Sequence, residues 1–155
     1  KSSENQKQRF FFPLNQETNF KMNKYFRTIT KNKKKTIKIL NIKGRTFEIK
    51  NFYEGISRFN FKELCDQNLG AEDYLEIANN SSFIVIENIP EFDDINSNQQ
   101  LRFITLLDVI YDKGIPIAVT ASQNLDKFTS SMSLEKQFKR TISRLYELTS
   151  RNYKQ

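Results

Sequence analysis

Two short apolar runs on either side of a helical pattern constrain the fold most strongly. Phe83-Ile84-Val85-Ile86 is continuously apolar, as in a strand that is covered on both faces. Between residues 100 and 112 apolar side chains recur at helical spacing, and Gly114 ends that helix. Ile115 to Thr120 predicts a second buried strand. A strand, a helix and a strand in this order predict a parallel pair with a right-handed crossover, so the fold class is α/β with a parallel βαβ core.

The segment that precedes this core predicts a helix and a hairpin. Asn15 is placed to cap a helix that runs to about Thr30, after a short extended segment at 9–12. Apolar residues alternate along 36–42 and 45–50 around Lys43-Gly44, which predicts a β-hairpin. We therefore divide the chain into residues 1–35, an N-terminal helix and basic connector, and residues 36–155, an α/β region.

Three further helices are predicted from capping residues and breaks. Asn60 with Glu63 three residues later has the pattern of a capping box, after an extended or irregular approach over 52–59. Gly70 ends that short helix and a second one starts at Ala71. Ser133 is placed to cap a final helix that contains Phe138, Ile142, Leu145 and Leu148 among other apolar residues.

Composition excludes several kinds of chemistry. The chain has 155 residues with no histidine and a single cysteine, Cys65. Without histidine there is no Ser-His-Asp or Cys-His arrangement and no imidazole zinc site, and one cysteine allows no intrachain disulfide. Cys65 has no base to activate it, so it is interpreted as a small core residue. The longest apolar runs are too short to span a bilayer, and we expect a cytoplasmic protein.

The net charge of +7 is concentrated in the first third of the chain. Residues 1–50 hold 14 Lys or Arg against 3 acids, whereas residues 51–155 hold 11 against 15. The cluster Lys31-Asn32-Lys33-Lys34-Lys35 is suited to phosphate backbones or acidic partners, and the alternative interpretation is a solvated linker. We do not expect specific nucleic-acid binding.

No segment of the sequence forms a phosphate cradle. The four glycines are scattered, and neither G-x-x-x-x-G-K-[ST] nor G-x-G-x-x-G occurs. Ile86-Glu87-Asn88 and Thr120-Ala121-Ser122 end the two predicted strands with polar side chains. These are either residues that orient magnesium or phosphate, or ordinary strand ends that meet water.

Arginines of the last helix are the strongest candidates for contact with phosphate. Arg140 and Arg144 lie four residues apart and share a helix face, with Glu147 three residues beyond Arg144. Two aligned arginines can hold a phosphate and stabilise charge in phosphoryl transfer. The alternative is a local ion pair on a solvated surface.

Several motifs in order resemble one family, the ZapE-type AAA+ ATPases. Arg58-Phe59-Asn60-Phe61-Lys62-Glu63-Leu64-Cys65 and Leu69-Gly70-Ala71-Glu72-Asp73-Tyr74-Leu75 are similar to its R-F-x-F-x-E-L-C and L-G-A-x-D-Y-L motifs. The resemblance continues through Arg102-Phe103-Ile104-Thr105-Leu106-Leu107-Asp108. It ends in Phe138-Lys139-Arg140-Thr141-Ile142-Ser143-Arg144-Leu145-Tyr146-Glu147-Leu148, near the family's F-x-R-T-x-S-R-L-x-E-M. Lys139 and Leu148 depart from a usual acid and a usual Met.

The resemblance implies the C-terminal part of an ATP-hydrolysing protein, a partial P-loop-type fold without the phosphate-binding half. It implies ATP and Mg²⁺ as cofactors of the intact protein, though not of this segment alone, and a homo-oligomer. The partners it implies are proteins such as division-ring components. Arg140, Arg144 and Arg102 match motif positions and are carried over as candidate catalytic, phosphate-contacting residues.

Two alternative functions remain. The chain is also compatible with a non-catalytic protein-binding module whose aromatic, basic N-terminal region makes the contact. The other alternative is a nucleic-acid-binding segment at Lys31–Lys35, which predicts affinity that falls steeply with salt.

Overall fold

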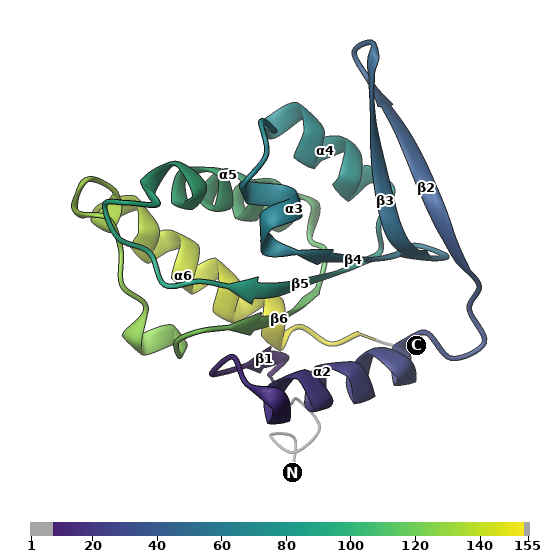
Figure 1. Ribbon diagram of the computed structural model, residues 1–155, viewed down its shortest axis with the longest axis horizontal. Helices are drawn as coiled ribbons and strands as arrows, with labels where there is room; N and C mark the ends of the chain where they lie inside the picture. Colours follow the sequence, from purple (N-terminus) through teal and green to yellow (C-terminus); the bar gives the residue numbers. More distant parts are fainter. Residues whose placement is uncertain (1–7, 154–155) are drawn as a thin grey trace.

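A computed structural model describes residues 8–153, and six strands within them form one sheet in the order β1-β6-β5-β4-β3-β2 (Figure 1). β1, β6, β5 and β4 are mutually parallel, whereas β3 and β2 join antiparallel. The strands are β1 (Phe10–Phe11), β2 (Lys35–Ile42), β3 (Arg45–Tyr53), β4 (Ile56–Asn60), β5 (Phe83–Ile89) and β6 (Ile117–Ala121). The helices are α2 (Gln16–Ile29), α3 (Phe61–Cys65), α4 (Ala71–Asn79), α5 (Ser97–Lys113) and α6 (Glu135–Ser150).

Helices cover both faces of the sheet, which gives three layers (Figure 1). Because side chains alternate along a strand, each central strand contributes to two cores. Val85 and Ala118 pack with Met22 and Phe26 of α2 on one face. The other strand face packs under α3, α4, α5 and α6 in the larger cluster. The near-continuous apolar runs of β5 and β6 follow from this double coverage.

The predicted α/β class and its parallel core are confirmed. β5 and β6 pair in parallel through Ile84↔Ile117 and Ile86↔Val119, with α5 between them in the chain. The helix capped by Asn15 is confirmed as α2, because the Asn15 Oδ1 accepts a 2.8 Å hydrogen bond from the Thr18 N–H. Both halves of the Asn60–Glu63 capping box form at α3.

One local prediction is refined and another is wrong. Of the two alternatives for residues 52–59, the extended one holds, because they form the end of β3, a turn at Glu54-Gly55 and most of strand β4. β4 escapes pattern analysis because its middle is polar: Ser57 is buried and hydrogen-bonded to the Ser81 hydroxyl at 2.7 Å. Ser133 does not cap α6, since it lies in a 3₁₀ turn, Met132–Leu134, and its hydroxyl meets Ser131 instead.

The hairpin of β2 and β3 extends past the rest of the sheet, with β2 outermost (Figure 1). Its inner face carries Leu40, Ile42 and Ile49 into the core. The Arg45 Nη1 lies 2.6 Å from Asp73 Oδ1, which ties the hairpin to α4. The hairpin is therefore anchored at one face and exposed at the other.

Candidate functional site

Most polar residues of the first motif hold the fold together. Arg58 forms two hydrogen bonds to the Glu87 carboxylate of the neighbouring strand, at 2.7 and 2.8 Å. Its guanidinium also lies over the Phe26 ring, 4.5 Å from the centroid. Arg58 therefore joins β4, β5 and α2, and the carboxylate at the end of β5 is engaged by this ion pair.

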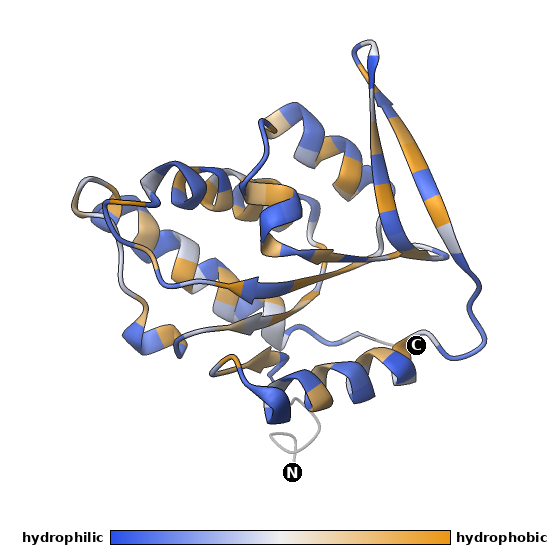
Figure 2. Cartoon of the chain, viewed as in Figure 1, coloured by the Kyte–Doolittle hydropathy of each residue, from blue (hydrophilic) through white to orange (hydrophobic). Residues whose placement is uncertain are grey.

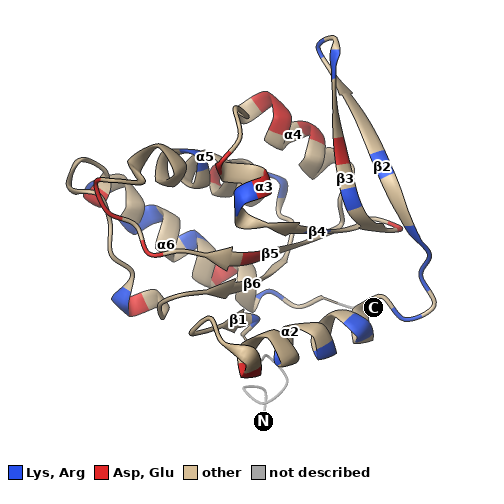
Figure 3. Cartoon of the chain, viewed as in Figure 1, with Lys and Arg blue, Asp and Glu red and all other residues tan. Residues whose placement is uncertain are grey.

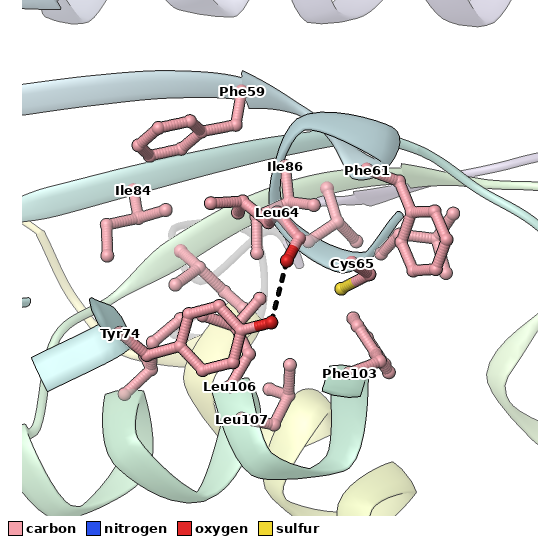
Figure 4. Close-up of a cluster of buried hydrophobic side chains, with 14 of the residues drawn as sticks. Phe59, Phe61, Leu64, Cys65, Tyr74, Ile84, Ile86, Phe103, Leu106 and Leu107 are labelled. Carbon is pink, nitrogen blue, oxygen red and sulfur yellow. Dashed lines mark hydrogen bonds between the residues drawn. The ribbon is translucent and has the colours of Figure 1, made fainter. Parts of the chain in front are cut away.

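Residues of the first two motifs, together with residues of β5 and α5, build the core beneath α3 (Figure 4). The Tyr74 hydroxyl donates a 2.6 Å hydrogen bond to the Leu64 carbonyl, which fastens α4 to α3. Cys65 is fully buried, and burial raises the pKa of its thiol far above the ordinary value. The thiol is therefore kept protonated, which agrees with its interpretation as a core residue.

Two of the three candidate arginines are held by contacts with other motifs. Arg102 on α5 donates a 3.1 Å hydrogen bond to the Cys65 carbonyl. Arg144 on α6 forms an ion pair with Asp108 on α5, and its guanidinium lies 4.5 Å from the Tyr111 ring centroid. These contacts join the helices on which the motifs lie, and they occupy both guanidinium groups.

Arg140, the third candidate, is exposed on α6 and makes no hydrogen bond or ion pair with any residue in the range 8–153. Lys136 and Lys139 lie on the same helix and border a groove of about 760 Å³. The floor of this groove, which we call the α6 groove, is apolar and includes Phe128, Phe138 and Ile142. Lys and Arg positions along α6 are visible in Figure 3, and the groove residues show that an apolar hollow lies beside them.

The polar ends of β5 and β6 contact each other. The Thr120 hydroxyl accepts a 2.7 Å hydrogen bond from the Asn88 N–H, and Thr120 is fully buried. Asn88 has a positive φ of 67°, where the β5–β6 register shifts. A second hollow of about 700 Å³ opens beside Asn88 and Asn60, at the carboxyl end of the parallel strands. Ligands of open α/β sheets commonly bind at this end.

The described residues do not form a complete site for ATP with Mg²⁺. Residues 8–153 contain no group of three or more His, Cys, Asp or Glu that is placed to hold a metal ion. Gly44, Gly55 and Gly114 have positive φ in separate turns and a helix end, so they do not form one loop around a phosphate.

The mostly parallel sheet with helices on both faces defines an α/β protein of partial P-loop type. More specifically, the chain belongs to the AFG1-like ATPase family, whose model matches residues 1–155. It is 37% identical over 90 residues to lactation elevated protein 1 homolog B of Danio rerio, which covers 58% of this chain and 18% of that protein. It is 24% identical over 141 residues to the cell division protein ZapE of Escherichia coli K12, which covers 91% of this chain and 38% of ZapE. The resemblance to ZapE-type AAA+ ATPases is thereby confirmed.

The chain spans well under half the length of each of these two relatives. No solved structure matches it. None of the helices within 8–153 has the length and apolar character needed to cross a membrane.

Proposed function

We propose that this chain is the C-terminal module of a cytoplasmic ATP-hydrolysing AAA+ protein that acts on other proteins. Membership of the AFG1-like ATPase family supports the ATPase part. The relative named as a cell division protein motivates division-ring components as the partners to test first. Nucleotide and Mg²⁺ would be held mainly by other parts of the intact protein, because residues 8–153 lack a cradle and a carboxylate cluster.

The observation that most supports this proposal is that Arg140 is exposed and has no hydrogen bond or ion pair among the described residues. Within the last motif, Arg144 is engaged by Asp108 and Tyr111, and Glu147 accepts a hydrogen bond from the Tyr111 hydroxyl. Arg140 lies four residues before Arg144 on the same helix and is exposed without such a contact. A guanidinium that the fold does not use is available to a ligand or a neighbouring subunit.

The role proposed for Arg140 is to stabilise negative charge on a phosphate that another part of the assembly holds. A guanidinium offers two parallel N–H donors to phosphate oxygens and keeps its charge at any physiological pH. In a homo-oligomer, this arginine would reach the nucleotide of the adjacent subunit. Arg102 and Arg144 would then act as positioning residues that set α5 and α6.

We expect Arg140→Ala in the full-length protein to lower ATP turnover by at least about tenfold, because a transition-state charge loses its partner. Arg140→Lys should recover only part of the rate, since an ammonium lacks the planar fork. Lys113→Ala, which also removes an exposed cation, serves as the matched control and should leave turnover unchanged. Steady-state phosphate release is the measurement, and urea unfolding shows that each variant is folded. Wild-type turnover in Arg140→Ala would remove this arginine from the mechanism.

A further inference from the structure

The outer edge of β2 is open. β2 ends the strand order, and among the described residues no strand pairs with its outer side. The register shift of the hairpin lies on β3, where Lys50 and Asn51 stand opposite the single residue Ile37. β2 itself therefore stays regular, and every second N–H and C=O along it points outward for another strand.

Two large apolar side chains are exposed on the outer face of β2. Ile37 and Ile39 are 60% and 56% exposed, and they share one face because they are two residues apart in a strand. The inner face carries Leu40 and Ile42, which are buried. Figure 2 shows apolar segments along the outer strand of the hairpin. Ile37 and Ile39 belong to neither hydrophobic core cluster. A bound partner would bury them.

The same segment carries all of the net charge of the chain. Residues 31–50 contain eight Lys or Arg and one Glu, and the remaining 135 residues contain 17 of each sign. Lys43 and Arg45 pair with Glu72 and Asp73 of α4. Lys31 and Lys34, before β2, and Lys35, its first residue, are exposed without an ion pair to any residue in 8–153. The basic residues gather on the hairpin and the connector before it (Figure 3).

We propose that β2 docks an extended acidic segment of a protein partner by strand addition. Backbone groups of the segment would extend the ladder at the outer edge of β2, and alternate apolar side chains would pack on Ile37 and Ile39. Its acidic residues would meet the lysines of the connector and of β2. The inference rests on the proposed action on protein partners, and it names the chemistry of the partner segment.

The charge and the exposed apolar side chains of β2 favour an acidic protein segment over a second copy of the chain or a nucleic acid. A second copy of the chain would bring like charge to like charge, and lysines at an edge strand oppose such pairing. A nucleic acid would use the lysines but not the isoleucines, since base stacking requires aromatic faces. Phe47 and Phe52 of β3 are only partly exposed and pack against the core.

The test measures binding of a synthetic fluorescein-labelled peptide, Glu-Val-Glu-Val-Asp-Ile-Glu, to the 155-residue chain by fluorescence anisotropy. A peptide of the same sequence, N-methylated at alternate residues, keeps the charge and the side chains but loses its ladder donors. We expect the unmodified peptide to bind and the methylated one to bind at least about tenfold more weakly. Hydrogen exchange should show slower exchange of β2 amides when the unmodified peptide is present.

Substitutions test the contribution of the exposed isoleucines separately from that of the lysines. Ile37→Thr/Ile39→Thr keeps β-branched residues in the strand and should raise the Kd at least about tenfold by removing apolar area. Lys34→Glu/Lys35→Glu should also raise the Kd at least about tenfold at low salt, with a smaller effect at high salt. Ile95→Thr and Lys24→Glu/Lys113→Glu make the same kinds of change at exposed positions elsewhere and should leave the Kd unchanged.

Three results would overturn the proposal. One is equal affinity of the methylated and unmodified peptides, which would show attraction by charge without strand pairing. Another is a Kd that the isoleucine variant leaves unchanged. The third is tighter binding of a labelled dT20 strand that displaces the peptide, which would assign the hairpin to nucleic acid. None of these readouts depends on ATP turnover, so failure here is distinct from failure of the Arg140 proposal.

Discussion

At the scale of single residues, polar side chains of the motifs mostly contact one another. Arg102 of the third motif reaches the Cys65 carbonyl of the first, and Asp108 of the third motif pairs with Arg144 of the last. Such contacts between segments far apart in the sequence cannot be read from helical spacing, which offered Arg144 only a partner on its own helix. Of the three candidate arginines, only Arg140 makes no hydrogen bond or ion pair with another residue in 8–153.

Because Arg144 pairs with Asp108 and Arg140 has no such partner, replacing Arg144 should lower the stability of the fold more than replacing Arg140. The two side chains are 23% and 35% exposed, so the pair is partly shielded from solvent, and Arg144 also covers the Tyr111 ring. We expect Arg144→Ala to lower the free energy of unfolding by about 1–3 kcal/mol. Arg140→Ala, the same change on an exposed face of the same helix, should cost less than about 0.5 kcal/mol.

Urea unfolding at neutral pH measures both effects. In a double-mutant cycle, Asp108→Ala should be non-additive with Arg144→Ala by about 1 kcal/mol, because each substitution removes the same interaction. Additive losses would show that the ion pair contributes nothing to α5–α6 docking, and the structural account of Arg144 would fail.

At the scale of secondary-structure elements, those defined by a local pattern were predicted and those defined by distant contacts were not. α2, α3 and the hairpin follow from capping residues and alternation within a few positions. β4 was missed because Ser57 and Arg58 interrupt its apolar pattern, and their partners, Ser81 and Glu87, lie more than 20 residues away. Similarly, nothing local identifies β2 as a sheet edge, since the strand order depends on the whole chain.

Asp73 predicts how the contact between hairpin and α4 depends on pH. Its Oδ2 accepts a 2.8 Å hydrogen bond from the Gly70 N–H at the start of α4, and Arg45 lies against its Oδ1. Burial raises the pKa of Asp73, but the ion pair with Arg45 and the hydrogen bond from the Gly70 N–H outweigh burial, so the net shift is downward. A lowered pKa in the folded state adds stability above the unfolded pKa of about 3.9, and this stability is lost as the pH falls through the folded value.

We therefore expect the difference in unfolding free energy between wild type and Asp73→Asn to be largest near pH 7 and to shrink toward pH 3. The asparagine keeps an oxygen for the Gly70 N–H but has no charge at any pH, so it matches the protonated wild-type side chain. Urea unfolding across this pH range is the measurement, with Asp112→Asn as an exposed control. A difference that stays constant with pH would show that the Asp73 charge does not stabilise the fold.

At the scale of the whole molecule, the two ends of the described chain meet at Phe83, on the α2 side of the sheet. Arg9 beside β1 is 7% exposed, and its guanidinium donates to the carbonyls of Ile117 and Leu148, which joins β6 to the end of α6. Burial lowers the pKa of Arg9. Tyr153 returns to the α2 side, with its ring centroid 4.4 Å from that of Phe83. The predicted division at residue 35 stays a prediction, but α2 and the later strands share one core.

This shared core predicts that both layers of helices unfold as one unit. Phe26 of α2 is 5% exposed and packs edge-on against Tyr53, 5.0 Å between ring centroids, whereas Phe20 on the same helix is 62% exposed. Phe26→Ala should lower the free energy of unfolding by about 3–5 kcal/mol, and Phe20→Ala by less than about 0.5 kcal/mol. In native-state hydrogen exchange, Phe26→Ala should lower the protection free energy of the slowest-exchanging amides. The decrease should be the same in α5 and α6, on the opposite face, as in α2. A loss confined to α2 would instead show that the N-terminal helix opens independently and that residues 36–155 form a separate folding unit.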